Sequence, residues 1–181
     1  MEHWNNLYKE LADKITNNLT EVAWVDLWHE QIQYLTAELP FPTPAVFIAF
    51  KTLGMDDKGL LVQDCNTQID FYLFYETFSD TYQGSYNQDG ALGFLDTLTR
   101  IHKLFHCQSG DNYNAMRRVD LNREESGGAG NLYRISFQAM ITDESAMRQI
   151  TMTDVSEVEV SNEVFVMATN TDNEPLYDIA T

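Results

Sequence analysis

The sequence predicts an α+β domain: a mixed, mostly antiparallel sheet with an N-terminal helix and a central amphipathic helix packed on one face. Three observations predict this class. Residues 45–50 form an uncharged run typical of a buried strand, residues 68–76 alternate between two faces, and two longer segments repeat apolar residues at helical spacing. The expected order is roughly α-β-β-β-α-β-β, followed by a C-terminal extension.

The first central strand is expected at residues 45–50, which are rich in branched and aromatic side chains. The prolines before it, of which Pro44 is the last, force an extended approach to the strand. The residues after it are turn formers, and we expect them to end the strand, at Gly54, Asp56, Asp57 and Gly59.

The second central strand alternates over residues 68–76, with Ile69, Phe71, Leu73 and Tyr75 on one face. The opposite face carries Tyr72 and Phe74 beside Asp70 and Glu76. A sheet face open to water is normally polar, so two aromatic residues indicate a covered surface. The cover is either another copy of the chain or a helix of the same chain.

Two segments, residues 3–19 and 90–107, are expected to be amphipathic helices. The Asn17-Asn18 pair marks the end of the first, and the second should pack on the apolar face of the 68–76 strand. Their apolar positions are Trp4, Leu7, Tyr8, Leu11, Ile15 and Leu19, and then Ala91, Phe94, Leu95, Leu98, Ile101, His102 and Phe105.

The remaining elements are a short strand, a polar loop and a hairpin. Residues 21–39 fit either a strand or a helix, and we favour a strand at 22–28 followed by a loop or helical turn. Residues 78–89 form a polar connection exposed enough to contact a neighbour. Strands at 115–124 and 131–142, joined by a glycine-rich loop, add a hairpin to the sheet.

The composition changes near the C-terminus. Residues 143–181 hold nine acidic residues and one basic residue, which gives −8 of the total net charge of −17. We therefore expect one α+β domain at residues 1–143 and an acidic extension at 144–181, either an arm or an extra edge hairpin.

The charge of the whole chain, with 28 acidic and 11 basic residues, argues against a surface that binds duplex DNA. It leaves a protein that surrounds DNA without holding it, one that imitates DNA, or ordinary solubility. No apolar run reaches the length of a membrane span, so no membrane partner is expected and the cytoplasm is the expected location. Cys65 and Cys107 are expected to be free, buried thiols.

Two groups of residues are of types that can carry chemistry. His102 and His106 lie four apart on a predicted helix with Cys107 beside them, a spacing that can bind zinc, but no third ligand is evident. Asp56 and Asp57, like the carboxylates of the 68–76 strand, are interpreted as solvated surface. No catalytic residue, cofactor or metal site is predicted, and the pattern favours an assembly protein.

The sequence resembles the tail terminator proteins of long-tailed bacteriophages, also called minor tail or tail-to-head joining proteins, in the prophage form found in gut Bacteroidetes. The resemblance covers about residues 3–143. It rests on the N-terminal helix, Trp24-Val25-Asp26-Leu27-Trp28 followed by Gln31, the run from Phe41 to Ile48, Gln63, Asp80-Thr81, the helix from Ala91 to Phe105 and the closing hairpin.

The resemblance implies a homo-oligomer, a hexameric ring that caps the tail tube and joins it to the head connector. Its partners would be the tail-tube and head-connector proteins, and DNA would pass through without specific binding. Its location would be the cytoplasm of the bacterial host during assembly and then the virion tail. The candidate subunit contacts are Tyr72, Phe74, Tyr82 and Tyr86. The alternatives are an acidic DNA-mimic inhibitor of a DNA-processing enzyme and a small metal-dependent enzyme.

Overall fold

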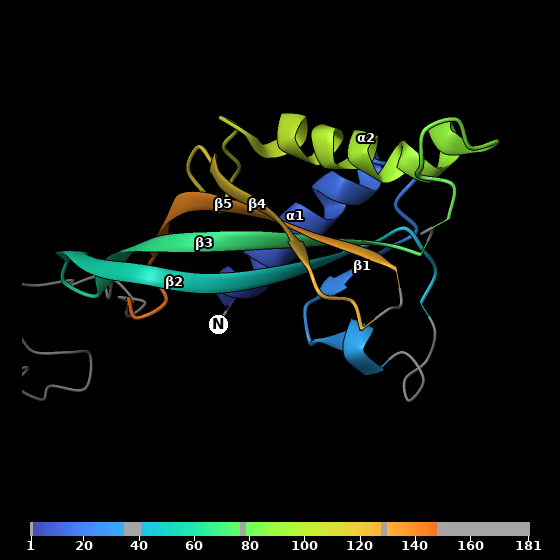
Figure 1. Cartoon of the computed structure of the whole chain (residues 1–181). Coiled ribbons are helices and arrows are strands. Elements are labelled where there is room, and N and C mark those ends of the chain that lie inside the picture. Colours follow the sequence, from blue (N-terminus) through green and yellow to red (C-terminus); the bar gives the residue numbers. More distant parts are fainter. Residues whose placement is uncertain (1, 35–40, 77–78, 128–129, 148–181) are drawn as a thin grey trace, which may run out of the picture. The chain divides into compact units, whose positions relative to one another are not determined.

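A computed structural model describes residues 2–34, 41–76, 79–127 and 130–147 of the chain. Its centre is a five-stranded sheet in the order β1-β2-β3-β5-β4 (Figure 1). The strands are β1 (Trp24–Leu27), β2 (Ala45–Gly59), β3 (Val62–Tyr75), β4 (Arg117–Glu124) and β5 (Asn131–Asp143). Only β1 and β2 pair in parallel, so the predicted mixed and mostly antiparallel sheet is confirmed.

Two helices, α1 (Glu2–Asn18) and α2 (Gln88–Phe105), cover one face of this sheet (Figure 1). The predicted order α-β-β-β-α-β-β is confirmed. The apolar side chains on one face of each helix pack against the inward-facing side chains of the strands. Burial of this apolar surface is the main contribution that favours folding. The core they form includes Leu7, Leu11, Ile15, Val46, Ile48, Ile69, Phe71, Phe94, Ile101, Phe105, Ile135 and Phe137.

The prediction that the glycine and aspartate cluster ends the first central strand is wrong. β2 continues through Gly54 and ends at Gly59, and the turn to β3 is made by Leu60 and Leu61. The pairing of β2 with β3 shifts in register between Thr52 and Gly54 and again between Asp57 and Gly59. A bulge admits an extra residue without ending the ladder, so β2 and β3 form a long hairpin.

The opposite face of the sheet is covered at one end by side chains of the same chain that precede β2, among them Trp28 and Phe41. Ile32, in the short 3-10 helix η1 (Gln31–Tyr34), is buried there with Phe47 and Phe74. The Gln31 side chain fixes this turn, since its amide donates to the Leu27 carbonyl at 2.6 Å and its oxygen accepts from the His29 N–H at 2.7 Å. The aromatic residues on this face of β3 are therefore covered by residues of the same subunit.

Gly130 allows the start of β5 to approach the end of β3. Its φ is +158°, and a side-chain Cβ would lie 2.6 Å from the Tyr75 carbonyl oxygen. A larger residue would push these two strands apart, because the obstructing atom belongs to the backbone.

Residues 1–147 form one compact unit. Of the extension predicted at 144–181, residues 148–181 lie outside the described residues. No helix of the described residues is long and apolar enough to cross a membrane.

Candidate functional site

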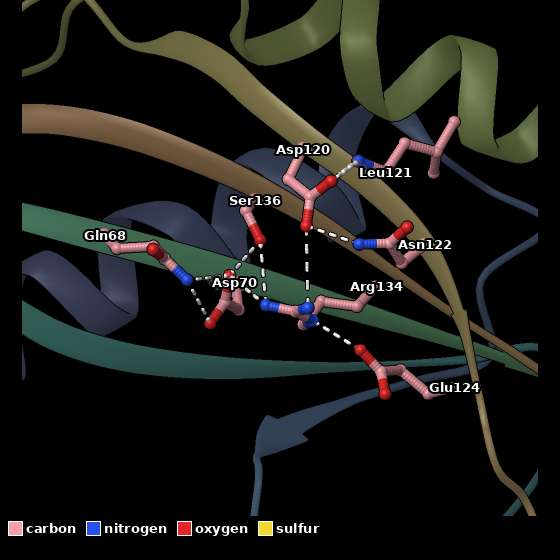
Figure 2. Close-up of polar contacts among 8 residues, drawn as sticks. All are labelled: Gln68, Asp70, Asp120, Leu121, Asn122, Glu124, Arg134 and Ser136. Carbon is pink, nitrogen blue, oxygen red and sulfur yellow. Dashed lines mark hydrogen bonds and ion pairs between the residues drawn. The ribbon is translucent and has the colours of Figure 1, made fainter.

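A polar network occupies the face of the sheet opposite the helices, over β3, β5 and β4 (Figure 2). At its centre is Asp70, a residue that is only 6% exposed. Gln68 donates from its amide nitrogen to both Asp70 oxygens, at 2.9 and 3.0 Å, and the Ser136 hydroxyl donates to Oδ1. These donors compensate the desolvation that a buried carboxylate would otherwise suffer.

Arg134 of β5 connects this buried carboxylate to the edge of the sheet (Figure 2). Its Nε donates to Glu124 Oε1 at 2.6 Å, its Nη2 lies 3.5 Å from Asp120 Oδ2, and its Nη1 lies 3.9 Å from Asp70 Oδ1. The hydrogen bond with Glu124 raises the pKa of the Arg134 guanidinium above its ordinary value, and the nearby carboxylates act in the same direction. One planar cation thus joins three acidic residues from two other strands.

The network follows from the pairing register. Asp70 lies opposite Ser136, and Asn122 lies opposite Arg134, so the alternation of each strand places these side chains on one face. From the sequence, Arg134 and Ser136 are only two polar positions within the strand predicted at 131–142. The strand pairing that brings Ser136 beside Asp70 joins residues 66 positions apart, so a local sequence pattern cannot predict it.

The four predicted contact residues differ in their exposure. Phe74 is 2% exposed and packs against Phe41 within the subunit, with ring centroids 5.9 Å apart, so it presents no surface to a second copy. Tyr72 is half-buried and stacks on Trp28, with centroids 4.2 Å apart and planes within 8°. Burial raises the pKa of the Tyr72 hydroxyl, and Asp70 adds to this rise.

Tyr82 and Tyr86 lie in the connection before α2 and are both exposed, at 67% and 104%. They are the members of the predicted set that a neighbouring molecule could reach. A subunit contact at these two residues and at the half-buried Tyr72 stays a prediction.

His102 and His106 lie side by side near the end of α2, with ring centroids 4.6 Å apart. His106 Nδ1 accepts a hydrogen bond from the Arg118 N–H at 3.2 Å. Cys107 is exposed, so the prediction that its thiol is buried is wrong. Among the described residues no group of three or more His, Cys, Asp or Glu side chains could hold a metal ion.

Burial of His102 predicts a pH dependence of stability. Its Nδ1 is buried without a hydrogen-bond partner in the described structure, and desolvation lowers its pKa below 6.5, assisted by Arg118 and His106. The folded chain therefore prefers neutral His102 more than the unfolded chain does. Stability from this group is complete above pH about 6.5 and is lost as the pH falls from there through the lower folded-state pKa.

We expect His102→Gln to flatten this part of the pH profile, measured as the urea midpoint between pH 8 and pH 5. His29→Gln, a change at an exposed histidine, serves as the control and should leave the parent profile unchanged. If His102→Gln retains the full parent slope while His29→Gln removes it, the assignment to His102 is wrong.

The carboxylates weighed as a possible site are separated in the structure. Asp56 and Asp57 lie on the exposed part of β2, and Asp57 accepts a hydrogen bond from Gln63 Nε2 at 2.9 Å. Glu76 is exposed beyond β3 and accepts a hydrogen bond from the Thr43 hydroxyl at 3.4 Å. Asp70 alone is buried, within the network described above.

A polar cavity of about 600 Å³ lies beside the N-terminal turns of α1, lined by His3, Asp111, Asn112 and Glu144 among others. Glu10 holds one wall in place. Its carboxylate accepts from the Asp111 and Asn112 backbone N–H groups at 2.8 and 3.0 Å and from the Asn112 amide at 2.7 Å. These charge-assisted bonds fix a loop that would otherwise leave its N–H groups unpaired.

No protein-family model matches the chain, and no curated protein matches it.

Proposed function

We propose that this chain is a structural subunit of a bacteriophage tail, of the tail terminator kind, which closes into a ring on the end of the tail tube and joins the tail to the head connector. The observation that carries the proposal is the fold, whose N-terminal helix, central helix and closing hairpin are features on which the resemblance rests. The step from fold to function is an analogy, so an assembly experiment has to decide it.

The charge distribution supports the proposal. A ring that DNA traverses gains from a surface that does not bind phosphates, and the chain carries a net charge of −17. On the polar face of the sheet, Arg134 is already bound to Glu124 and close to two further carboxylates, so this cation is not free for a phosphate. In the virus-producing cell such a subunit would act in the bacterial cytoplasm and then remain in the virion tail.

The experiment is the mass in solution by light scattering, first of the chain alone and then with the tail-tube protein encoded beside it. We expect six times the chain mass of 20.8 kDa in at least one of the two conditions. A monomer in both conditions would contradict the proposal. In that case pull-down of a DNA-processing enzyme would test the DNA-mimic alternative.

A further inference from the structure

The sheet has two open edges within the described residues. β1 pairs with β2 only over Ala45–Ile48, which leaves β2 without a partner strand on that side from residue 49 to residue 59. At the other edge β4 pairs only with β5. Each edge offers backbone C=O and N–H groups to a further strand. On β4 two N–H groups are already bound within the chain: that of Arg118 donates to His106 Nδ1 at 3.2 Å, and that of Leu121 donates to Asp120 Oδ1 at 2.9 Å.

Both edges carry exposed apolar side chains. Leu53 and Met55 on β2 are 46% and 51% exposed, and Val119 and Leu121 on β4 are 48% and 44% exposed. Of twelve large exposed apolar side chains in the described residues, six lie on the β2–β3 hairpin or on β4. This concentration indicates a contact surface more than scattered surface residues do.

The charged residues without ion pairs differ in net sign between the two edges. On β4, Arg117, Arg118 and Arg123 are exposed and form no ion pair with any described residue, whereas the acidic residues of that strand are bound by Arg134. On β2, Lys58 pairs with Asp64 at 3.4 Å, and Lys51, nearer the start of the open segment, is exposed without an ion pair in the described residues.

The neighbouring Asp56 and Asp57 are exposed and form no ion pair in the described part of the chain. The free charge of β4 is therefore positive, and that at the open end of β2 is negative. Like edges would repel each other, and unlike edges would attract.

We propose that β4 of one copy adds to the open edge of β2 in the next copy, so that the sheet continues from subunit to subunit. This inference rests on the proposed ring and locates its interface. β2 and β4 run in opposite directions within one sheet, because each successive pair between them is antiparallel. Copies related by rotation about an axis along the strands would therefore pair antiparallel.

Such an interface is heterologous: it joins two different surfaces and leaves one of each kind free at the ends until a ring closes. The backbone ladder would supply affinity, and the apolar and charged side chains would set the register, as in other cases of strand addition. The polar face with the Asp70–Arg134 network would then continue around the ring.

The first test substitutes lysine at one residue of each edge. Leu121→Lys and Met55→Lys should each raise the concentration for half-assembly about tenfold or more, which corresponds to about 1.4 kcal/mol. Leu95→Lys is the matched control, because Leu95 is 43% exposed but lies on α2. All three sites are exposed, so thermal unfolding should show a change within about 0.5 kcal/mol of the parent.

The second test exchanges the charges. One variant carries Arg118→Asp and Arg123→Asp, and the other carries Asp56→Arg and Asp57→Arg. Each should fail to assemble by itself, since both of its edges then carry the same sign.

A 1:1 mixture of the two variants should recover the parent mass, because each altered edge meets a complementary edge in an alternating ring. Lys9→Asp with Lys103→Asp changes the net charge as much as the first variant does, at exposed sites on the two helices. This control should assemble like the parent.

The outcomes separate this inference from the proposed function. If the parent forms a sixfold species and both edge lysine variants assemble as well as Leu95→Lys, the ring stands and the edge pairing is wrong. If the parent remains a monomer both alone and with the tail-tube protein, the proposed ring and the proposed edge pairing are both wrong. Recovery in the mixture, with failure of each variant alone, would support the pairing specifically.

The arginines of β4 could instead serve a phosphate backbone, and the same variants test that. If Arg118→Asp with Arg123→Asp abolishes binding of a labelled duplex, measured by fluorescence anisotropy, and leaves the assembled mass unchanged, the edge pairing is overturned in favour of a nucleic-acid contact.

Discussion

Phe71→Ala is expected to lower the free energy of unfolding by about 3–5 kcal/mol. Phe71 is fully buried, and its ring stacks on Phe105 with centroids 4.5 Å apart and meets Phe137 edge-on at 5.7 Å. It thus joins β3 to α2 and to β5. Truncation removes the apolar contact area and leaves a cavity that three rigid elements cannot close, which is the situation in which such losses are largest.

The loss should be measured by urea unfolding followed by tryptophan fluorescence. Typical domains have only about 5–15 kcal/mol of stability, so the variant should show a strongly reduced midpoint. Phe50→Ala is the control, because Phe50 is half-buried at the sheet margin, where its ring lies 5.7 Å from Trp4. A loss in Phe71→Ala no greater than in Phe50→Ala would contradict the central position assigned to this ring.

Local periodicity was sufficient to predict the elements that carry this core. The apolar positions of α2 and the alternation of β3 are both properties of neighbouring residues, and burial enforces them in the folded chain. For the same reason the predicted packing of α2 on the Phe71 face is confirmed by the contact of Phe71 with Phe105.

The end of β2 could not be predicted in the same way. Gly54 and Gly59 disfavour a strand locally, but β3 supplies a partner ladder as far as Gly59 and that pairing decides the outcome. The cover over Phe74 is similar. The aromatic residues of β3 indicated a covered face, whereas the identity of the cover depends on Phe41 and Trp28, which are distant in the sequence.

The polar network could not be predicted from the sequence for a further reason. Asp70 was interpreted as a solvated carboxylate, and it is buried. Its burial is tolerated because Ser136 and Gln68 donate to it and Arg134 lies nearby. Residue type alone cannot distinguish an exposed carboxylate from one whose partners arrive from another strand.

Arg134→Met is expected to cost about 3 kcal/mol, the lower part of the range for removing one partner of a buried ion pair. Methionine preserves much of the apolar stem, so the loss reports the guanidinium rather than packing. Without that charge, Asp70 stays buried with neutral donors only, and Asp120 and Glu124 remain close to it without a shared cation. Urea unfolding at pH 7 measures the effect.

Arg100→Met provides the matched control, since Arg100 also forms an ion pair, with Glu21 at 2.6 Å, but its side chain is 46% exposed against 23% for Arg134. An exposed pair is worth at most about 1 kcal/mol, so this variant should lose clearly less. Adding Asp70→Asn to Arg134→Met should recover part of the loss, because the buried charge is then removed together with its partner. The prediction is contradicted if the two arginine variants lose equal stability and the double variant recovers none of it. The network would then contribute no more than an ordinary surface ion pair, and Ser136 and Gln68 alone would stabilise the buried Asp70.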